Sequence, residues 1–129
     1  MGLAERRLVA AAQEQEFKPF AEKIKGILGY DVTLDFDWGA IENHSNINHV
    51  CESKKITSNC FDKITEAFTK ICADDMGKTA VREKLKGIKM IPTSGDMEFA
   101  NGLFTIRTCV DGNGVWGADQ IQSELEKHL

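Results

Sequence analysis

Residues 96–107, with the sequence DMEFANGLFTIR, decide the expected fold because they read as a β-hairpin with a fixed register. Asn101-Gly102 suits a two-residue type I′ turn, in which both central residues need a positive φ. Counting outward from this turn pairs Ala100 with Leu103, and the same register continues to the other end of the stretch. The apolar face then carries Met97, Phe99, Phe104 and Ile106, and the polar face carries Asp96, Glu98, Thr105 and Arg107. The sequence therefore predicts a sheet that is apolar on one side only.

The overall composition is that of an ordinary globular protein. The 129 residues are 42% hydrophobic and 28% charged, and the formal net charge is −4. This length predicts one domain over residues 1–129, which can bury roughly two-thirds of its unfolded surface. A mildly acidic chain has no general electrostatic attraction to nucleic acid or to anionic lipid. We therefore expect neither nucleic acid nor a membrane among its partners.

The N-terminal residues and the cysteines bear on the expected location in the cell. Arg6 and Arg7 precede a short apolar run, but glutamines and glutamates follow at residues 13–16, so a helix is expected rather than a signal peptide. No apolar run approaches the roughly 18 residues that span a bilayer. The four cysteines, which show no Cys-x-x-Cys spacing, are Cys51, Cys60, Cys72 and Cys109. Without a secretory signal, reduced thiols in the cytoplasm are the expected state.

Apolar periodicity predicts the elements along the first half of the chain. An alanine-rich helix is expected from Leu3 to Glu16, and Pro19 should end it and open a second helix that stops at Gly29. Strict alternation predicts a strand over residues 30–38, whose buried face carries Val32, Leu34, Phe36 and Trp38. The polar stretch Gly39 to Lys55 lacks periodicity and is expected to be a loop with at most a short helical turn.

The second half of the chain predicts helices around the hairpin. These helices run over residues 58–73, 74–86 and 119–128, and Gly87 ends the second of them. Their expected N-caps are Ser58 for the first, Asp74 or Asp75 for the second, and Asp119 for the third. A short strand, Ile88 to Ile91, precedes the hairpin, whose second strand can extend to Val110. This order predicts an α+β fold: a two-layer sandwich of a mainly antiparallel sheet of about four strands, with helices packed on one face. The three consecutive strands would form an antiparallel meander, and the earlier strand would join one of its edges.

The polar face of the predicted sheet supplies the first candidate site. Asp35 and Asp37 alternate along the first strand and lie about 7 Å apart, given the rise per residue. Paired carboxylates can bind hard cations or divide acid and base roles. One strand supplies too few ligands for a metal, so a solvated or partner-binding face is favoured. The predicted partner-binding residues are Asp35, Asp37, Lys89, Glu98 and Arg107.

Histidines and cysteines in and after the predicted loop supply a second candidate site. His44, His49, Cys51 and Cys60 are all soft-metal ligand types, but His-x4-His and His-x-Cys are not recurrent zinc spacings. A thiol of Cys51 or Cys60 beside a histidine would make a nucleophile pair. The sequence shows no oxyanion hole or orienting third residue for such a pair, and it leaves open whether the four side chains meet in space.

Two further patterns give weaker signals. Residues 111–119, DGNGVWGAD, begin like a calcium loop, but Val115 and Trp116 stand where an EF-hand needs an oxygen ligand and a glycine. A flexible connection between a strand and a helix explains this stretch better. Lys78, Arg82 and Lys86 recur every four residues as a basic stripe, but the clustered aromatic residues of nucleic-acid readers are missing.

Three functions are therefore ranked. The first is a non-catalytic protein-interaction module of the adaptor, inhibitor or immunity type, which binds a protein partner or a second copy through the polar sheet face or residues 39–55. The second is a small-ligand or metal-binding domain that uses His44, His49 and a cysteine. The third is a small hydrolase-like enzyme that uses Asp35 and Asp37, or a cysteine with a histidine. The sequence assigns no catalytic residue, metal ligand or cofactor, and it leaves the oligomeric state open.

Overall fold

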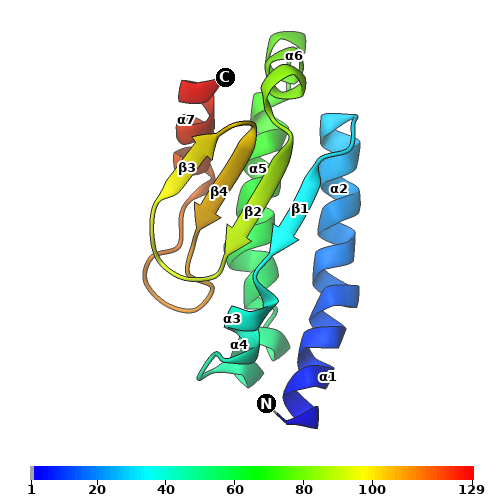
Figure 1. Ribbon diagram of the computed structural model, residues 1–129, viewed down its shortest axis with the longest axis vertical. Coiled ribbons are helices and arrows are strands. Elements are labelled where there is room, and N and C mark those ends of the chain that lie inside the picture. The colour runs from blue at the N-terminus through cyan, green and yellow to red at the C-terminus, as the bar shows by residue number, and fades with distance from the viewer. Residues whose placement is uncertain (1) are drawn as a thin grey trace.

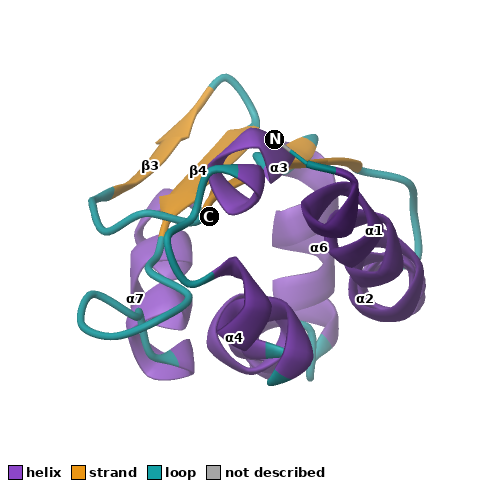
Figure 2. Cartoon of the chain, turned by 90° about the horizontal axis from the view of Figure 1, so that it is seen from below, coloured by secondary structure: helices purple, strands orange, loops and turns teal. Residues whose placement is uncertain are grey.

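In the computed structural model, which describes residues 2–129, a four-stranded sheet lies against a layer of helices (Figure 1). The sheet has the order β1-β2-β4-β3 and consists of β1 (Thr33–Phe36), β2 (Gly87–Ile91), β3 (Met97–Ala100) and β4 (Leu103–Arg107). In the end-on view, the helices that pack on the sheet lie on one side of it (Figure 2). The predicted α+β class with a four-stranded sheet is confirmed.

The sheet is mixed and mostly parallel, so the expected antiparallel meander is wrong. β1 runs parallel to β2, and β2 runs parallel to β4; only the β3–β4 pair is antiparallel. After β2 the chain forms β3 at the edge of the sheet. It then returns as β4, which lies between β2 and β3. Burial explains this order, because the inward side chains of β2 and β4 are fully buried, as in central strands, whereas Met97 and Phe99 of β3 are only half-buried.

The hairpin itself has the predicted register. The ladder contains the pairs Met97–Ile106, Glu98–Thr105, Phe99–Phe104 and Ala100–Leu103. Both turn residues have a positive φ, 54° at Asn101 and 82° at Gly102, as a type I′ turn requires. Phe99 and Phe104 lie on the same face, with ring centroids 6.5 Å apart. The second strand ends at Arg107 rather than at Val110.

One continuous helix, rather than two separate ones, precedes β1. A π-helical turn, Gln13–Phe17, joins α1 (Leu3–Ala12) to α2 (Lys18–Leu28). In this turn the Lys18 N–H donates to Gln13 O, five residues back. The predicted break at Pro19 is wrong, because the proline stands in the first turn after this wider segment, where its missing N–H is tolerated. Gly29, with a φ of 77°, ends α2 as predicted.

The segment from Gly39 to Lys55 is largely helical, so its prediction as a loop is wrong. It contains α3 (Trp38–Glu42) and α4 (Ile47–Glu52), each too short to show periodicity in the sequence. The Asp37 carboxylate caps α3 by accepting a 3.3 Å hydrogen bond from the Ala40 N–H. The strand therefore ends at Phe36, and Trp38 belongs to a helix.

The next helix starts earlier than predicted. It begins at Lys55, and a second π-helical turn, Thr57–Phe61, leads into α5 (Asp62–Ile71). Ser58 does not cap this helix, because its Oγ donates to Lys54 O, 3.3 Å away. The apolar stripe that favoured a helix here is buried and consists of Phe61, Ile64, Ala67, Phe68, Ile71 and Cys72.

The last two helices, α6 (Asp75–Lys84) and α7 (Ala118–His128), differ in how they begin. Asp74 caps α6 as predicted, with Oδ1 2.7 Å from the Gly77 N–H nitrogen. Asp119 does not cap α7: the Gly117 N–H instead donates to Gln120 Oε1 at 2.8 Å. Gly117 is therefore the N-cap residue of α7, and the Gln120 amide oxygen in the first turn accepts a hydrogen bond from its N–H.

Aromatic side chains fill the space between the layers near β1. Phe20 of α2 stacks on Phe61 with a centroid distance of 4.4 Å, and Phe36 of β1 meets Phe61 edge-on at 5.5 Å. This packing fixes Phe36 inward, so the preceding residue, Asp35, points to the opposite face of the sheet.

Candidate functional site

The described helices leave one face of the sheet uncovered (Figure 2). The strand pairing places exposed charged residues on this face. The register places one residue from each strand in a single row: Asp35 of β1, Lys89 of β2, Thr105 of β4 and Glu98 of β3. Arg107 lies further along β4, and its Nη1 is 3.3 Å from Glu98 Oε1. We call the four charged residues Asp35, Lys89, Glu98 and Arg107 the open-face cluster.

Asp37, the fifth predicted residue, lies beside the open-face cluster at the end of β1. Its N–H donates to Met90 O at 3.0 Å, and its carboxylate caps α3. The side chain that alternation assigned to the polar face is therefore committed to the start of a helix.

Asp35 and Lys89 carry opposite charges on this face. They are directly opposite on neighbouring strands and both are exposed. Among residues 2–129, neither takes part in an ion pair within 4.0 Å. Both side chains are therefore free to pair with charges on another molecule.

Two glycines, Gly87 and Gly95, leave the ends of this face without a side chain. Gly87, which was expected to end a helix, is instead the first residue of β2, and a Cβ there would collide with Thr33 Oγ1. A Cβ at Gly95 would lie 2.8 Å from Arg107 Cδ, so this glycine lets the arginine side chain lie along the end of the strands. A low, open surface of this kind fits a macromolecule better than a small ligand, which binds in concave sites.

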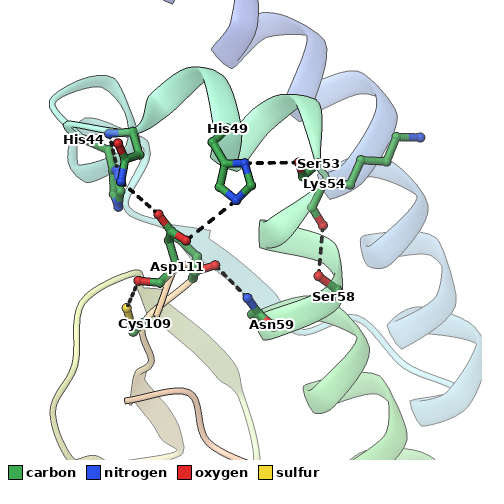
Figure 3. Close-up of polar contacts among 10 residues, drawn as sticks. His44, His49, Ser53, Lys54, Ser58, Asn59, Cys109 and Asp111 are labelled. Carbon is green, nitrogen blue, oxygen red and sulfur yellow. Dashed lines mark hydrogen bonds and ion pairs between the residues drawn. The ribbon is translucent and has the colours of Figure 1, made fainter. Parts of the chain in front are cut away.

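A second group of polar side chains ties the connection after β4 to α4 (Figure 3). His49 Nε2 lies 3.9 Å from Asp111 Oδ1, and the Asn46 amide donates to Asp111 Oδ2 at 3.2 Å. Asn59 Nδ2 donates to Val110 O at 2.7 Å. Asp111 thus anchors the connection, which agrees with reading its DGNG sequence as a strand-to-helix link.

Ser53, His49 and Asp111 stand in the order of a nucleophile, a base and an orienting carboxylate. Ser53 Oγ lies 3.4 Å from His49 Nδ1, and the His49–Asp111 distance is longer still. Both distances exceed the range of about 2.6–3.2 Å within which such groups act together. The His49 side chain is 56% exposed, so water surrounds it and screens its contact with the carboxylate. The arrangement resembles an ordinary contact at a helix end.

His44 and the cysteines do not complete a site with His49. His44 Nδ1 accepts a 2.9 Å hydrogen bond from a nearby backbone N–H. Within residues 2–129, no group of three or more His, Cys, Asp or Glu side chains is placed to hold a metal ion. Burial raises the pKa of the Cys51 thiol, with Glu16 and Glu52 adding to the rise, and burial raises the pKa of Cys60 to about 12. Neither thiol is therefore an activated nucleophile.

The basic stripe is an exposed helix surface. Lys78, Arg82 and Lys86 are all exposed, and the Arg82 guanidinium lies 5.7 Å from the centroid of the Tyr30 ring. This distance is that of a cation–π contact, so part of the charge is used within the fold.

Sequence reasoning missed a buried carboxylate, Glu16, in the first π-helical turn. Glu16 is only 5% exposed, and its Oε1 accepts hydrogen bonds from Thr57 N at 3.1 Å and Thr57 Oγ1 at 2.8 Å. The Thr57 N–H belongs to the first turn of a helix, where amides lack partners within the helix, so Glu16 caps that helix from another one. The only signal in the sequence is its spacing of four residues from both Ala12 and Phe20, which are buried.

Comparisons with protein-family models, with curated proteins and with solved structures return no match. Among residues 2–129, no helix combines the length and the apolar character needed to cross a bilayer. The functional proposal therefore rests on the geometry of this chain.

Proposed function

We propose that this protein is a non-catalytic protein-interaction module, of the adaptor, inhibitor or immunity type, and that the open-face cluster contacts its protein partner. The observation that carries the proposal is the row of Asp35, Lys89 and Glu98 on an uncovered face of the sheet. The signs along this row alternate, so a complementary surface would present charges in the opposite order. Charge patterns of this kind steer encounter and fix orientation more than they add affinity.

An exposed apolar side chain next to the charged row also supports a protein partner. Leu103 lies beside Gly87 on the same face and is 39% exposed. Protein interfaces combine apolar contacts with a polar rim, and here both occur on neighbouring rows of the sheet.

A charge exchange that leaves the net charge unchanged tests the proposal. The wild-type protein and the double variant Asp35→Lys/Lys89→Glu are immobilised, and bound proteins are captured from a lysate of the source cells. We expect the wild-type protein to retain a specific partner and the double variant to retain about tenfold less, because two attractive contacts become repulsive.

The matched control exchanges two exposed charges on α2, Glu22→Lys/Lys23→Glu, and should retain the partner like the wild-type protein. Thermal unfolding of all three proteins checks that each is folded. Equal retention by the Asp35/Lys89 variant and the control would show that the open-face cluster is not the contact surface.

A further inference from the structure

The outer edge of β3 carries unpaired main-chain groups. The Arg107 N–H donates to Asp96 O at 3.3 Å, and the two-residue turn closes between Ala100 and Leu103. In an antiparallel ladder the bonded pairs alternate, so residues 96, 98 and 100 bond to β4. The N–H and C=O groups of Met97 and Phe99 therefore point away from the sheet. β3 is the outermost strand, and no described element lies beside its outer edge (Figures 1 and 2).

A shallow groove lies at one end of this edge on its inner side, between Met97 of β3 and α7. It has a volume of about 350 Å³ and is lined by Met97, Trp116, Asp119, Gln120, Ser123, Glu124 and Lys127. Near the end of α7, the His128 ring stacks on Phe99 with a centroid distance of 5.4 Å. A strand added to β3 would point every second side chain toward this groove, because strand side chains alternate.

The charges of β3 disfavour pairing with a second copy of the same strand. Antiparallel pairing centred on Glu98 would set two carboxylates opposite each other, and pairing centred on Met97 would set Glu98 opposite Asp96. Pairing centred on Phe99 would run into Asn101, whose φ of 54° belongs to the turn. β3 contains neither the proline nor the lysine that often protects an edge strand, so its negative charge takes that role.

We infer that the β3 edge binds an extended segment of a partner protein, which adds to the sheet as an antiparallel strand. The segment carries Lys or Arg opposite Glu98, where charge complementarity with Glu98 and the neighbouring Asp96 selects it; both acidic residues are exposed. Of the two apolar residues that flank this basic residue, one points toward the groove at Met97 and the other points toward the stacked rings of Phe99 and His128. The main-chain groups of Met97 and Phe99 supply hydrogen bonds, and the alternating side chains supply specificity. This surface shares only Glu98 with the open-face cluster, and it does not depend on Asp35 or Lys89.

Two blocked peptides, acetyl-TVKVT-amide and acetyl-TVEVT-amide, test the inference. Each is titrated into the ¹⁵N-labelled full chain at low salt, and binding is followed by amide chemical shifts. We expect the amide signals of Met97 and Phe99 to move with the lysine peptide, which should bind roughly two- to tenfold more tightly than the glutamate peptide. In the variant Glu98→Lys the order of the two peptides should reverse.

Two controls separate strand addition from other contacts. Met97→Pro removes an outward N–H without removing a bond to β4, so it should abolish binding; if that variant does not fold, a lysine peptide N-methylated at both valines makes the same test on the wild-type protein. Equal binding of the two peptides, or shifts that leave Met97 and Phe99 unmoved, would overturn the inference. Sedimentation velocity of the protein alone gives a second test. A dimer of the wild-type protein that is absent in the Met97→Pro variant would also overturn the inference, because the edge would then bind a second copy.

Discussion

Cys60 and Tyr30 are ionisable side chains that the fold keeps in their neutral forms. Cys60 is 1% exposed, and burial raises its pKa to about 12. The pKa of Tyr30 is also raised to about 12, mainly by burial, and its hydroxyl lies 2.7 Å from Leu85 O, beyond the end of α6. A neutral phenol can donate to this carbonyl, which helps to close a helix end that lacks a glycine. These two groups therefore serve packing and capping.

Cys60 should make the protein less stable as the pH rises above 9. Its pKa of about 12 in the folded protein exceeds the ordinary value of 9.0, so the unfolded chain loses the proton first. The stability that depends on this thiol is complete below pH 9 and falls between pH 9 and pH 12, by at most about 1.4 kcal/mol per pH unit. Urea unfolding of wild-type and Cys60→Ala proteins from about pH 8 to about pH 10 measures the two slopes. The variant should show the shallower slope, and parallel slopes would contradict the expectation.

Two π-helical turns meet where the first long helix packs against the helix that begins at Lys55. Glu16 of the first turn accepts hydrogen bonds from the N–H and from the hydroxyl of Thr57, which lies in the second turn. π-helical turns widen a helix locally and displace side chains from their regular spacing. The contact both joins two helices and caps one of them.

Glu16→Ala should lower the free energy of unfolding by about 1–3 kcal/mol, because the Thr57 hydroxyl and N–H lose their acceptor in a partly buried position. The matched control is Glu14→Ala in the same turn, where the side chain is 72% exposed and pairs with Lys18. That variant should change stability by less than about 0.5 kcal/mol. Urea denaturation followed by circular dichroism gives both values. A Glu16 effect no larger than the Glu14 effect would show that the buried carboxylate does not act as a cap.

Local sequence signals account for the elements that were predicted correctly. The hairpin register follows from Asn101-Gly102 alone, and the N-cap of α6 follows from Asp74, since both act within a few residues. α3 and α4 escaped prediction because a helix of five or six residues completes too few turns to show a period. Pro19 was misleading because the π-helical turn before it changes which N–H groups the helix needs.

The arrangement of the strands could not be read from the sequence in the same way. β1 pairs with β2 only after α3, α4, α5 and α6 have intervened, and alternation states which face is buried but not which strands are neighbours. Alternation therefore placed Asp35, Lys89 and Glu98 on one face correctly, whereas the pairs Glu16–Thr57 and His49–Asp111 join distant segments and left no local signal. Packing between distant segments decided which strands are neighbours and which of these side chains meet.

Hydrogen exchange measured by NMR should reveal the strand order directly. Amides of β2 and β4 lie between two neighbouring strands and should exchange slowest, through global opening. On β3 the outward amides of Met97 and Phe99 should exchange at least about a hundredfold faster than that of Glu98, which bonds to β4. Glu98 is thus an internal control on the same strand. Equal protection of Met97 and Glu98 would mean that another segment covers the edge.

The described part of the chain begins and finishes at opposite ends of the long axis, and its carboxyl end directly follows α7 (Figure 1). His128 already stacks on Phe99 there. An affinity handle fused after Leu129 would start next to the outermost strand and would compete with any molecule approaching it. A handle placed ahead of Gly2 would emerge at the far end and leave the edge and the charged face unobstructed, so the amino end is the better point of attachment for every capture measurement.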